Sequence, residues 1–198
     1  IDCGGKYLSP GFIDVHCHGG GGGSFGKLEA EEHIKAMKMH LTHGVTAMTP
    51  TAMTIDPQEI RKLREIKEAI DKRDDLPHHL GYFMEGPLNQ PHPDMAIGAA
   101  NAPVITEDMY KETLEEAKGV VNRWMAAPEL EGGMEFGRAL RAAGITGCMG
   151  HSNATVADVE EAMKNGYSCV VHLYSVMSTV TRDNGFRRGG LVEAGLLF

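Results

Sequence analysis

The feature that most constrains the fold is a regular alternation of short apolar or β-branched runs with longer segments of helical pattern. Each short run has the length and composition of a buried strand. Strands are predicted at Gly11–His16, Val45–Thr49, Leu80–Met84, Asn122–Ala126, Ile145–Met149 and Ser168–His172. Helices are predicted at Glu29–His43, Pro57–Lys72, Glu107–Gly119, Met134–Ala143 and Thr155–Asn165. Because strands that alternate with helices form parallel sheets, the pattern predicts an α/β protein.

Local signals support these boundaries. Asp56 precedes Pro57 at a first helical position, and Thr106 precedes an acidic first turn. Gly144 and Gly166 stand where two helices should end.

The length bears on how the sheet is closed. A complete (β/α)8 barrel of the TIM type takes about 250 residues, so six units in 198 residues predict about the first six βα units of one. Residues 11–198 would form this partial barrel. The alternative is an open, doubly wound sheet.

The composition limits the classes of binding partner that the chain could have. The longest apolar stretches fall short of a membrane span, and the formal net charge is −8 with Lys and Arg scattered along the chain. We therefore expect a small-molecule substrate, with no nucleic-acid or membrane partner. The four cysteines form no CxxC pair and no signal peptide opens the chain, which predicts a reducing cytoplasm. The absence of an initiator Met and the abrupt end at Phe198 indicate a piece of a longer chain.

Five candidate metal ligands fall at the ends of predicted strands. His16 and His18 end the first strand, two positions apart, and therefore point the same way. Glu85 ends the third strand, His151 follows the fifth and His172 ends the sixth. Because the carboxyl ends of barrel strands form one rim, these side chains should meet at a metal site. The other six histidines are predicted to be surface or structural: His33, His40, His43, His78, His79 and His92.

This ligand set indicates metal-assisted hydrolysis. Imidazole and carboxylate ligands suit a divalent cation such as zinc, which lowers the pKa of a bound water toward about 7 and polarises a carbonyl. Cys17 lies between the two histidines, so its side chain should point to the opposite strand face as a buried structural thiol.

Two further features leave alternatives open. The glycines Gly19–Gly23 are either a flexible loop or a turn whose N–H groups approach an anion. Arg182, ten residues beyond His172, is either a clamp for a substrate phosphate or a solvated loop arginine.

The motifs together resemble the N-acetylglucosamine-6-phosphate deacetylase family of the amidohydrolase superfamily. The matching strings are Pro10-Gly11-Phe12-Ile13-Asp14-Val15-His16-Cys17-His18-Gly19-Gly20, Phe83-Met84-Glu85-Gly86-Pro87, Ala127-Pro128-Glu129, Gly150-His151-Ser152-Asn153-Ala154-Thr155 and His172-Leu173-Tyr174. The resemblance implies a (β/α)8 barrel with a small β-sandwich built from both chain ends, residues 1–10 forming one edge. It also implies a homodimer that removes acetate from the 2-acetamido group of N-acetylglucosamine 6-phosphate.

The resemblance also implies site roles. Glu85, His151 and His172 would hold the principal divalent metal, and His16 and His18 would help to hold a second. The substrate contacts depart from the family pattern, because Ala100 replaces a histidine after Ala99, Ser175 and Val176 replace an Asn-Ala pair, and Phe83 replaces another histidine. Arg182 matches an arginine that reaches the phosphate of substrate in the neighbouring subunit.

The essential aspartate of the family comes from strand eight, beyond the strands predicted here, so no catalytic acid or base is assigned and the 198 residues alone should be inactive. Two alternatives stay open. One is another metal-dependent amidohydrolase acting on a cyclic amide or as a base deaminase, and the other is a non-catalytic metal-binding fragment.

Overall fold

The computed structural model describes residues 2–91 and 102–198, and its centre is one parallel sheet. The strands are β1 (Phe12–Cys17), β4 (Val45–Ala52), β6 (Tyr82–Glu85), β7 (Val121–Ala126), β8 (Thr146–Met149) and β9 (Tyr167–Val170). They are neighbours in chain order, and the short β5 (His78–His79) pairs with β4 beside β6. A doubly wound sheet reverses its strand order partway along, so this unbroken order identifies the arc of a barrel.

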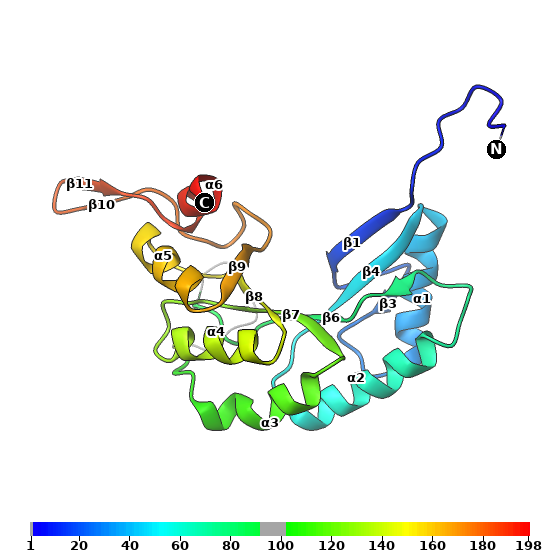
Figure 1. Ribbon diagram of the computed structural model, residues 1–198, viewed down its shortest axis with the longest axis horizontal. Coiled ribbons are helices and arrows are strands. Elements are labelled where there is room, and N and C mark those ends of the chain that lie inside the picture. Colours follow the sequence, from blue (N-terminus) through cyan, green and yellow to red (C-terminus); the bar gives the residue numbers. More distant parts are fainter. Residues whose placement is uncertain (1, 92–101) are drawn as a thin grey trace.

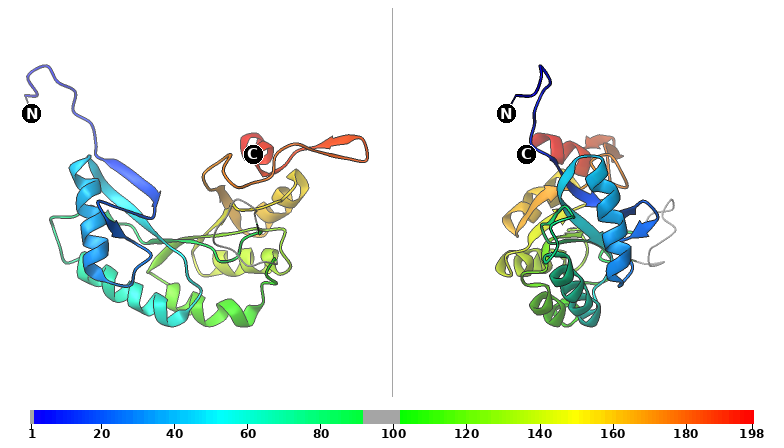
Figure 2. Two further views of the ribbon diagram at one scale, coloured as in Figure 1. Left: turned by 180° about the vertical axis from the view of Figure 1, so that it is seen from behind. Right: turned by 90° about the vertical axis from the view of Figure 1, so that its right-hand side faces the viewer.

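The helices cover the convex side of this arc (Figure 1). They are α1 (Ala30–Thr42), α2 (Pro57–Ile70), α3 (Glu107–Ala117), α4 (Gly133–Ala142) and α5 (Val156–Lys164), and a short α6 (Leu191–Leu197) packs on α5. Each helix contacts the next, while the concave side stays open between β1 and β9 (Figure 2). The chain thus forms a half-barrel of α/β class.

The helix signals are confirmed. The Asp56 carboxylate accepts the Gln58 N–H at 2.8 Å, with Pro57 as the first helical residue. Gly144 and Gly166 end their helices at φ +73° and +109°, values that residues with a Cβ rarely adopt.

Some strand ends differ from prediction. Strand β1 continues to Cys17 and β6 to Glu85, whereas β9 stops at Val170, two residues before His172. His78 and His79 precede β6 as predicted, and they also form the short strand β5. The hairpin of β10 (Thr181–Asp183) and β11 (Phe186–Arg188) was not predicted.

The glycine run folds as a second hairpin, β2 (Gly19–Gly20) with β3 (Gly23–Ser24), rather than as a flexible loop. It packs closely on α1, because a Cβ on Gly20 would lie 2.1 Å from the Met39 Cε atom and one on Gly23 would lie 2.3 Å from the Glu32 carbonyl oxygen. These glycines allow the hairpin backbone to contact the helix.

The core lies in two layers. Between sheet and helices, Trp124 and Phe136 meet edge to face, with ring centroids 5.7 Å apart. On the concave side, Phe83 packs with Met125 and Cys148. Because alternate residues of a strand share a face, Glu85 lies on the same concave face as Phe83.

Residues 2–11 contain no helix or strand and extend away from the sheet (Figure 1), so the predicted β-sandwich edge stays a prediction. No helix among the described residues is long and apolar enough to cross a membrane.

Candidate metal centre

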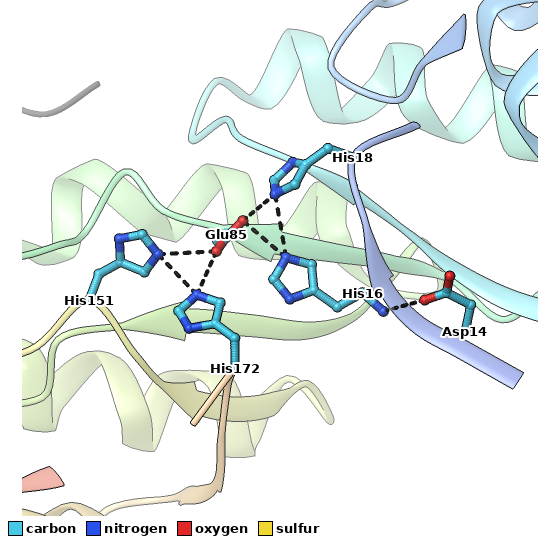
Figure 3. Close-up of polar contacts among 6 residues, drawn as sticks. All are labelled: Asp14, His16, His18, Glu85, His151 and His172. Atoms are coloured by element: carbon cyan, nitrogen blue, oxygen red, sulfur yellow. Dashed lines mark hydrogen bonds and ion pairs between the residues drawn. The ribbon is translucent and has the colours of Figure 1, made fainter. Parts of the chain in front are cut away.

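The structure brings together all five predicted ligands at the carboxyl ends of the strands (Figure 3). The four histidines lie around the carboxylate of Glu85, a residue whose side chain is only 6% exposed. Its Oε2 atom is 3.1 Å from the Nε2 of His16 and 2.7 Å from that of His18. Its Oε1 atom is 3.2 Å from the Nε2 of His151 and 3.0 Å from that of His172.

The geometry divides into two groups that share Glu85. One is His16, His18 and Glu85, and the other is Glu85, His151 and His172. Within each group the donor atoms lie within 4.8 Å of one another. A single carboxylate between two pairs of imidazoles suits either one divalent cation or two.

The donor atoms fit a cation better than they fit each other. The Nε2 atoms of His151 and His172 are 3.0 Å apart, and those of His16 and His18 are 3.4 Å apart. Each such pair makes one hydrogen bond at most, and where both Nε2 atoms are unprotonated their two lone pairs face the same region. Nitrogen and carboxylate oxygen ligands without sulfur are a zinc-type set. The role of these residues as ligands stays a prediction.

The electrostatics keep Glu85 ionised. Burial raises the pKa of its carboxyl, but the hydrogen bonds with His151, His16, His172 and His18 outweigh burial and hold that pKa well below its usual range. The hydrogen bond with Glu85 also raises the pKa of His172 above its ordinary value. The centre therefore has one fixed negative charge around which the imidazoles gather.

Backbone geometry directs two of the ligands. His151 has φ +46° and His172 has φ +33°, in the left-handed region that residues with a Cβ rarely adopt. A Glu129 carboxylate fixes the turn after His151, because it accepts the Ser152 hydroxyl at 2.7 Å and the Asn153 N–H at 2.6 Å. Sequence reasoning assigned no role to Glu129. Its position just past the end of β7, on the rim that carries the ligands, was the signal that could have found it.

The end of β1 is fixed in a similar way. The Asp14 carboxylate accepts the His16 N–H at 3.1 Å, and the pairing with β4 is irregular between Asp14 and Cys17. Cys17 is half-buried, rather than buried as predicted. Its thiol lies near Asp14 and His40, and burial and then the Asp14 charge raise the thiol pKa to about 12.

The five other described histidines lie outside the Glu85 centre. His33 is buried, with its ring nitrogens 2.7 Å from the Lys27 carbonyl oxygen and 3.0 Å from the Tyr82 hydroxyl. His79 is also buried, His40 is half-buried, and His43 and His78 are exposed, whereas His92 lies outside the described residues.

The predicted substrate contacts are more dispersed. Ala99 and Ala100 lie outside the described residues. Ser175 is exposed and Val176 half-buried in the turn after His172, where the Ser175 N–H donates to the His172 carbonyl oxygen at 2.9 Å. Arg182 is exposed on β10, in a hairpin that projects from the body of the molecule (Figure 1).

Known proteins resemble this chain in sequence. No family model matches the chain. It is 31% identical over 200 residues to the N-acetylglucosamine-6-phosphate deacetylase of Caenorhabditis elegans, and this match covers 93% of this chain and 47% of that protein. It is 34% identical over 193 residues to an N-acetylgalactosamine-6-phosphate deacetylase of Shewanella, covering 94% of this chain and 46% of that protein.

The chain is a relative of the N-acetylglucosamine-6-phosphate deacetylases. The crystal structure of the N-acetyl-D-glucosamine-6-phosphate deacetylase of Mycobacterium smegmatis matches it with a TM-score of 0.80 and 25% identity, over 93% of this chain and 51% of that one. A mutant of that deacetylase, in complex with N-acetyl-D-glucosamine-6-phosphate, matches with a TM-score of 0.74 and 25% identity, over 93% of this chain and 47% of that one. The chain spans about half the length of the relatives it matches. The predicted resemblance and the barrel class are confirmed.

Proposed function

We propose that this chain supplies the metal-binding half of an enzyme that hydrolyses N-acetylglucosamine 6-phosphate to glucosamine 6-phosphate and acetate. One observation carries the proposal: four imidazoles surround a buried carboxylate on the rim of a half-barrel that matches deacetylases. The C–N bond of the acetamide breaks, water supplies the new C–O bond, and the amine takes up a proton.

Glu85, His151 and His172 would hold the principal divalent cation, and His16 and His18 with Glu85 a second. Zinc is the proposed metal, as one ion or two. When bound, such a cation lowers the pKa of water and polarises a carbonyl oxygen. Glu85 fixes the positions of the imidazoles, and the half-exposed ring of His18 lies where the concave side is open to substrate.

Residues around the centre shape the space above it. The Phe83 ring meets the His16 ring edge to face, with centroids 4.9 Å apart, so it closes the floor beside that ligand. Ser175 and Val176, in the turn after His172, are proposed to contact the sugar, together with Ala99 and Ala100. The general acid and base is not assigned to a residue of this chain.

The projecting hairpin of β10 and β11 is the part of the chain that concerns phosphate binding and subunit assembly in this proposal. Arg182 pairs in register with Arg187 across the two strands, and both are exposed. An exposed guanidinium is suited to a phosphate. On the strength of the family resemblance alone, we propose that Arg182 reaches substrate in a neighbouring subunit of a homodimer. Cys17, Cys148 and Cys169 form no disulfide among the described residues, which accords with a reducing cytoplasm.

The test is acetate release from N-acetylglucosamine 6-phosphate by the full-length protein, with zinc and with chelator. Glu85→Gln should abolish both turnover and tight metal binding, whereas Glu161→Gln, at a carboxylate on α5, should change neither. Turnover only with N-acetylgalactosamine 6-phosphate, the substrate named for the Shewanella relative, would redirect the sugar assignment. No turnover of either sugar with metal bound would reject the proposal.

A further inference from the structure

A second group of possible metal ligands lies apart from the Glu85 centre. It consists of Asp14, Cys17 and His40, and one donor atom from each lies within 4.8 Å of the others. Asp14 and Cys17 belong to β1, and His40 is in the last turn of α1. In Figure 3, Asp14 lies beyond His16 from Glu85, so the group is separate from that centre.

The three side chains are partly enclosed rather than solvated. All three residues are half-buried, and the side chains of Asp14 and His40 are 27% and 16% exposed. The Asp14 Oδ2 atom is 3.8 Å from the His40 Nδ1 atom, too far for a direct hydrogen bond. The Cys17 thiol hydrogen-bonds to Asp14, so a carboxylate oxygen, a sulfur and a nitrogen converge at one place.

The hydrogen bonding of His40 points to a cation. Its Nε2 atom is 3.1 Å from the Gly19 carbonyl oxygen, which can only accept, so Nε2 carries the proton. In the neutral ring Nδ1 then has a lone pair that faces the Asp14 carboxylate, which is also an acceptor. A ring whose other nitrogen donates to a backbone carbonyl is the usual arrangement of a metal-binding histidine.

The glycine hairpin makes this arrangement possible. A Cβ on Gly20 would lie 3.0 Å from the His40 Nε2 atom, so glycine at this position lets the imidazole lie close beneath the β2 backbone. The same hairpin places the Gly19 carbonyl over the ring. The chain therefore holds His40 in place from both the helix and the hairpin.

We propose that Asp14, Cys17 and His40 bind a further divalent cation, separate from the Glu85 centre. It would be zinc or another metal that accepts a thiolate ligand. On binding, the Cys17 S–H bond breaks, the sulfur bonds to the metal and the proton leaves to solvent. The fourth position is left to water. The ion would fasten the end of β1 and the glycine hairpin to α1, beside His16 and His18. The site does not depend on the proposed deacetylase activity.

Cobalt(II) tests the site because its spectrum reports sulfur. The full-length protein is freed of metal with a chelator and titrated with cobalt(II). We expect a sulfur-to-cobalt charge-transfer band in the near ultraviolet, which the sulfur-free Glu85 centre cannot produce. Cys17→Ser should remove the band and lower the bound zinc by one equivalent per chain, and His40→Gln should weaken it.

Matched variants distinguish a cobalt signal from Cys17 from one that comes from another cysteine. Cys148→Ser alters a cysteine of the concave layer and should leave the band unchanged. Visible cobalt bands retained by Cys17→Ser would show that the variant is folded and that its Glu85 centre is intact. Absence of a near-ultraviolet band in the unaltered protein would overturn the proposal. A band that survives Cys17→Ser would overturn it as well.

Discussion

At the scale of single residues, the metal centre depends on carboxylates that fix the direction of other groups. Glu85 gathers four imidazoles, Asp14 holds the backbone at His16, and Glu129 holds the turn after His151. Each accepts hydrogen bonds that would otherwise leave a strained turn or a buried polar group unsatisfied.

Glu129 offers the sharpest test of positioning. Glu129→Gln keeps the shape, but it replaces one acceptor oxygen by an NH2 group opposite the Ser152 hydroxyl or the Asn153 N–H. Hydrogen bonds to a charged group are worth about 1.5–3 kcal/mol, and loss of an outer partner costs about 10–100-fold in metal affinity or activity. We expect metal affinity, measured by chelator competition, to fall by about that factor.

The control is Glu131→Gln, which changes an exposed carboxylate two residues further along the same loop. It should leave metal affinity unchanged. Equal affinities for Glu129→Gln and the unaltered protein would show that Glu129 does not position His151.

At the scale of elements, the periodicity of apolar residues predicts strands and helices that local sequence determines. It misses elements whose structure depends on tertiary packing. The main strands and helices follow from their apolar patterns, and α2 begins at Pro57 because Asp56 caps it. The β2–β3 hairpin carries almost no side chains, so its pairing depends on packing against α1, which no local pattern shows.

The candidate site divides in the same way. The five ligands could be predicted, because strand ends of a parallel barrel share a rim. The contacts of Glu129 with Ser152 and of His40 with Asp14 could not, because they join residues 23 and 26 positions apart whose approach is set by the tertiary fold.

The glycine hairpin should tolerate few side chains. Gly23→Ala forces a Cβ to within 2.3 Å of the Glu32 carbonyl oxygen and 2.8 Å of the Ala36 nitrogen, and overpacking of this kind costs about 1–3 kcal/mol. Gly26→Ala is the control, because its Cβ would meet only the Ser24 hydroxyl at an ordinary 3.6 Å. Chemical denaturation should show a loss of unfolding free energy for Gly23→Ala alone, and equal losses would argue against close packing on α1.

Strand β5 adds a dependence on pH. Burial, and after it the nearby positive charge of Lys67, lowers the pKa of His79 from 6.5 to about 3. Because the unfolded chain binds the proton more readily, the contribution of neutral His79 is complete above pH 6.5 and is lost as the pH falls toward 3. The loss is about 1.4 kcal/mol per pH unit at most.

This contribution is measured by the free energy of unfolding at pH 7 and pH 4.5. His79→Gln should reduce the difference between the two, while His78→Gln, at the exposed neighbour, should not. A difference unchanged in His79→Gln would mean that the buried ring is not protonated on unfolding in this range.

At the scale of the whole molecule, one centre connects the two ends of an open arc. The first strand, β1, supplies His16 and His18, and the chain leaving the last strand, β9, supplies His172. These two strands each have one neighbour among the described strands, and β1 exposes Phe12 and Ile13 at 68% and 62%. A cation at Glu85 would therefore strengthen the connection that Glu85 already makes between these parts of the sheet, through its hydrogen bonds with His16 and His172.

Metal removal should consequently destabilise the fold as a unit. A cation that binds only the folded state, at 100 times its dissociation constant, stabilises it by about 2.7 kcal/mol. A domain of 150–250 residues shifts by about 2–4 °C per kcal/mol, so zinc should raise the Tm of the full-length protein over the chelated form by at most about 5–10 °C. Glu85→Gln should lose this shift because the carboxylate shared by both ligand groups is gone, and Glu161→Gln should keep it.

Zinc bound at Cys17 would leave part of the shift in Glu85→Gln, so the double variant Glu85→Gln, Cys17→Ser separates the two contributions. A Tm that is the same with zinc and with chelator in the unaltered protein would mean that the ligands are already held in place by the sheet, and that the centre binds a cation without joining the ends of the arc.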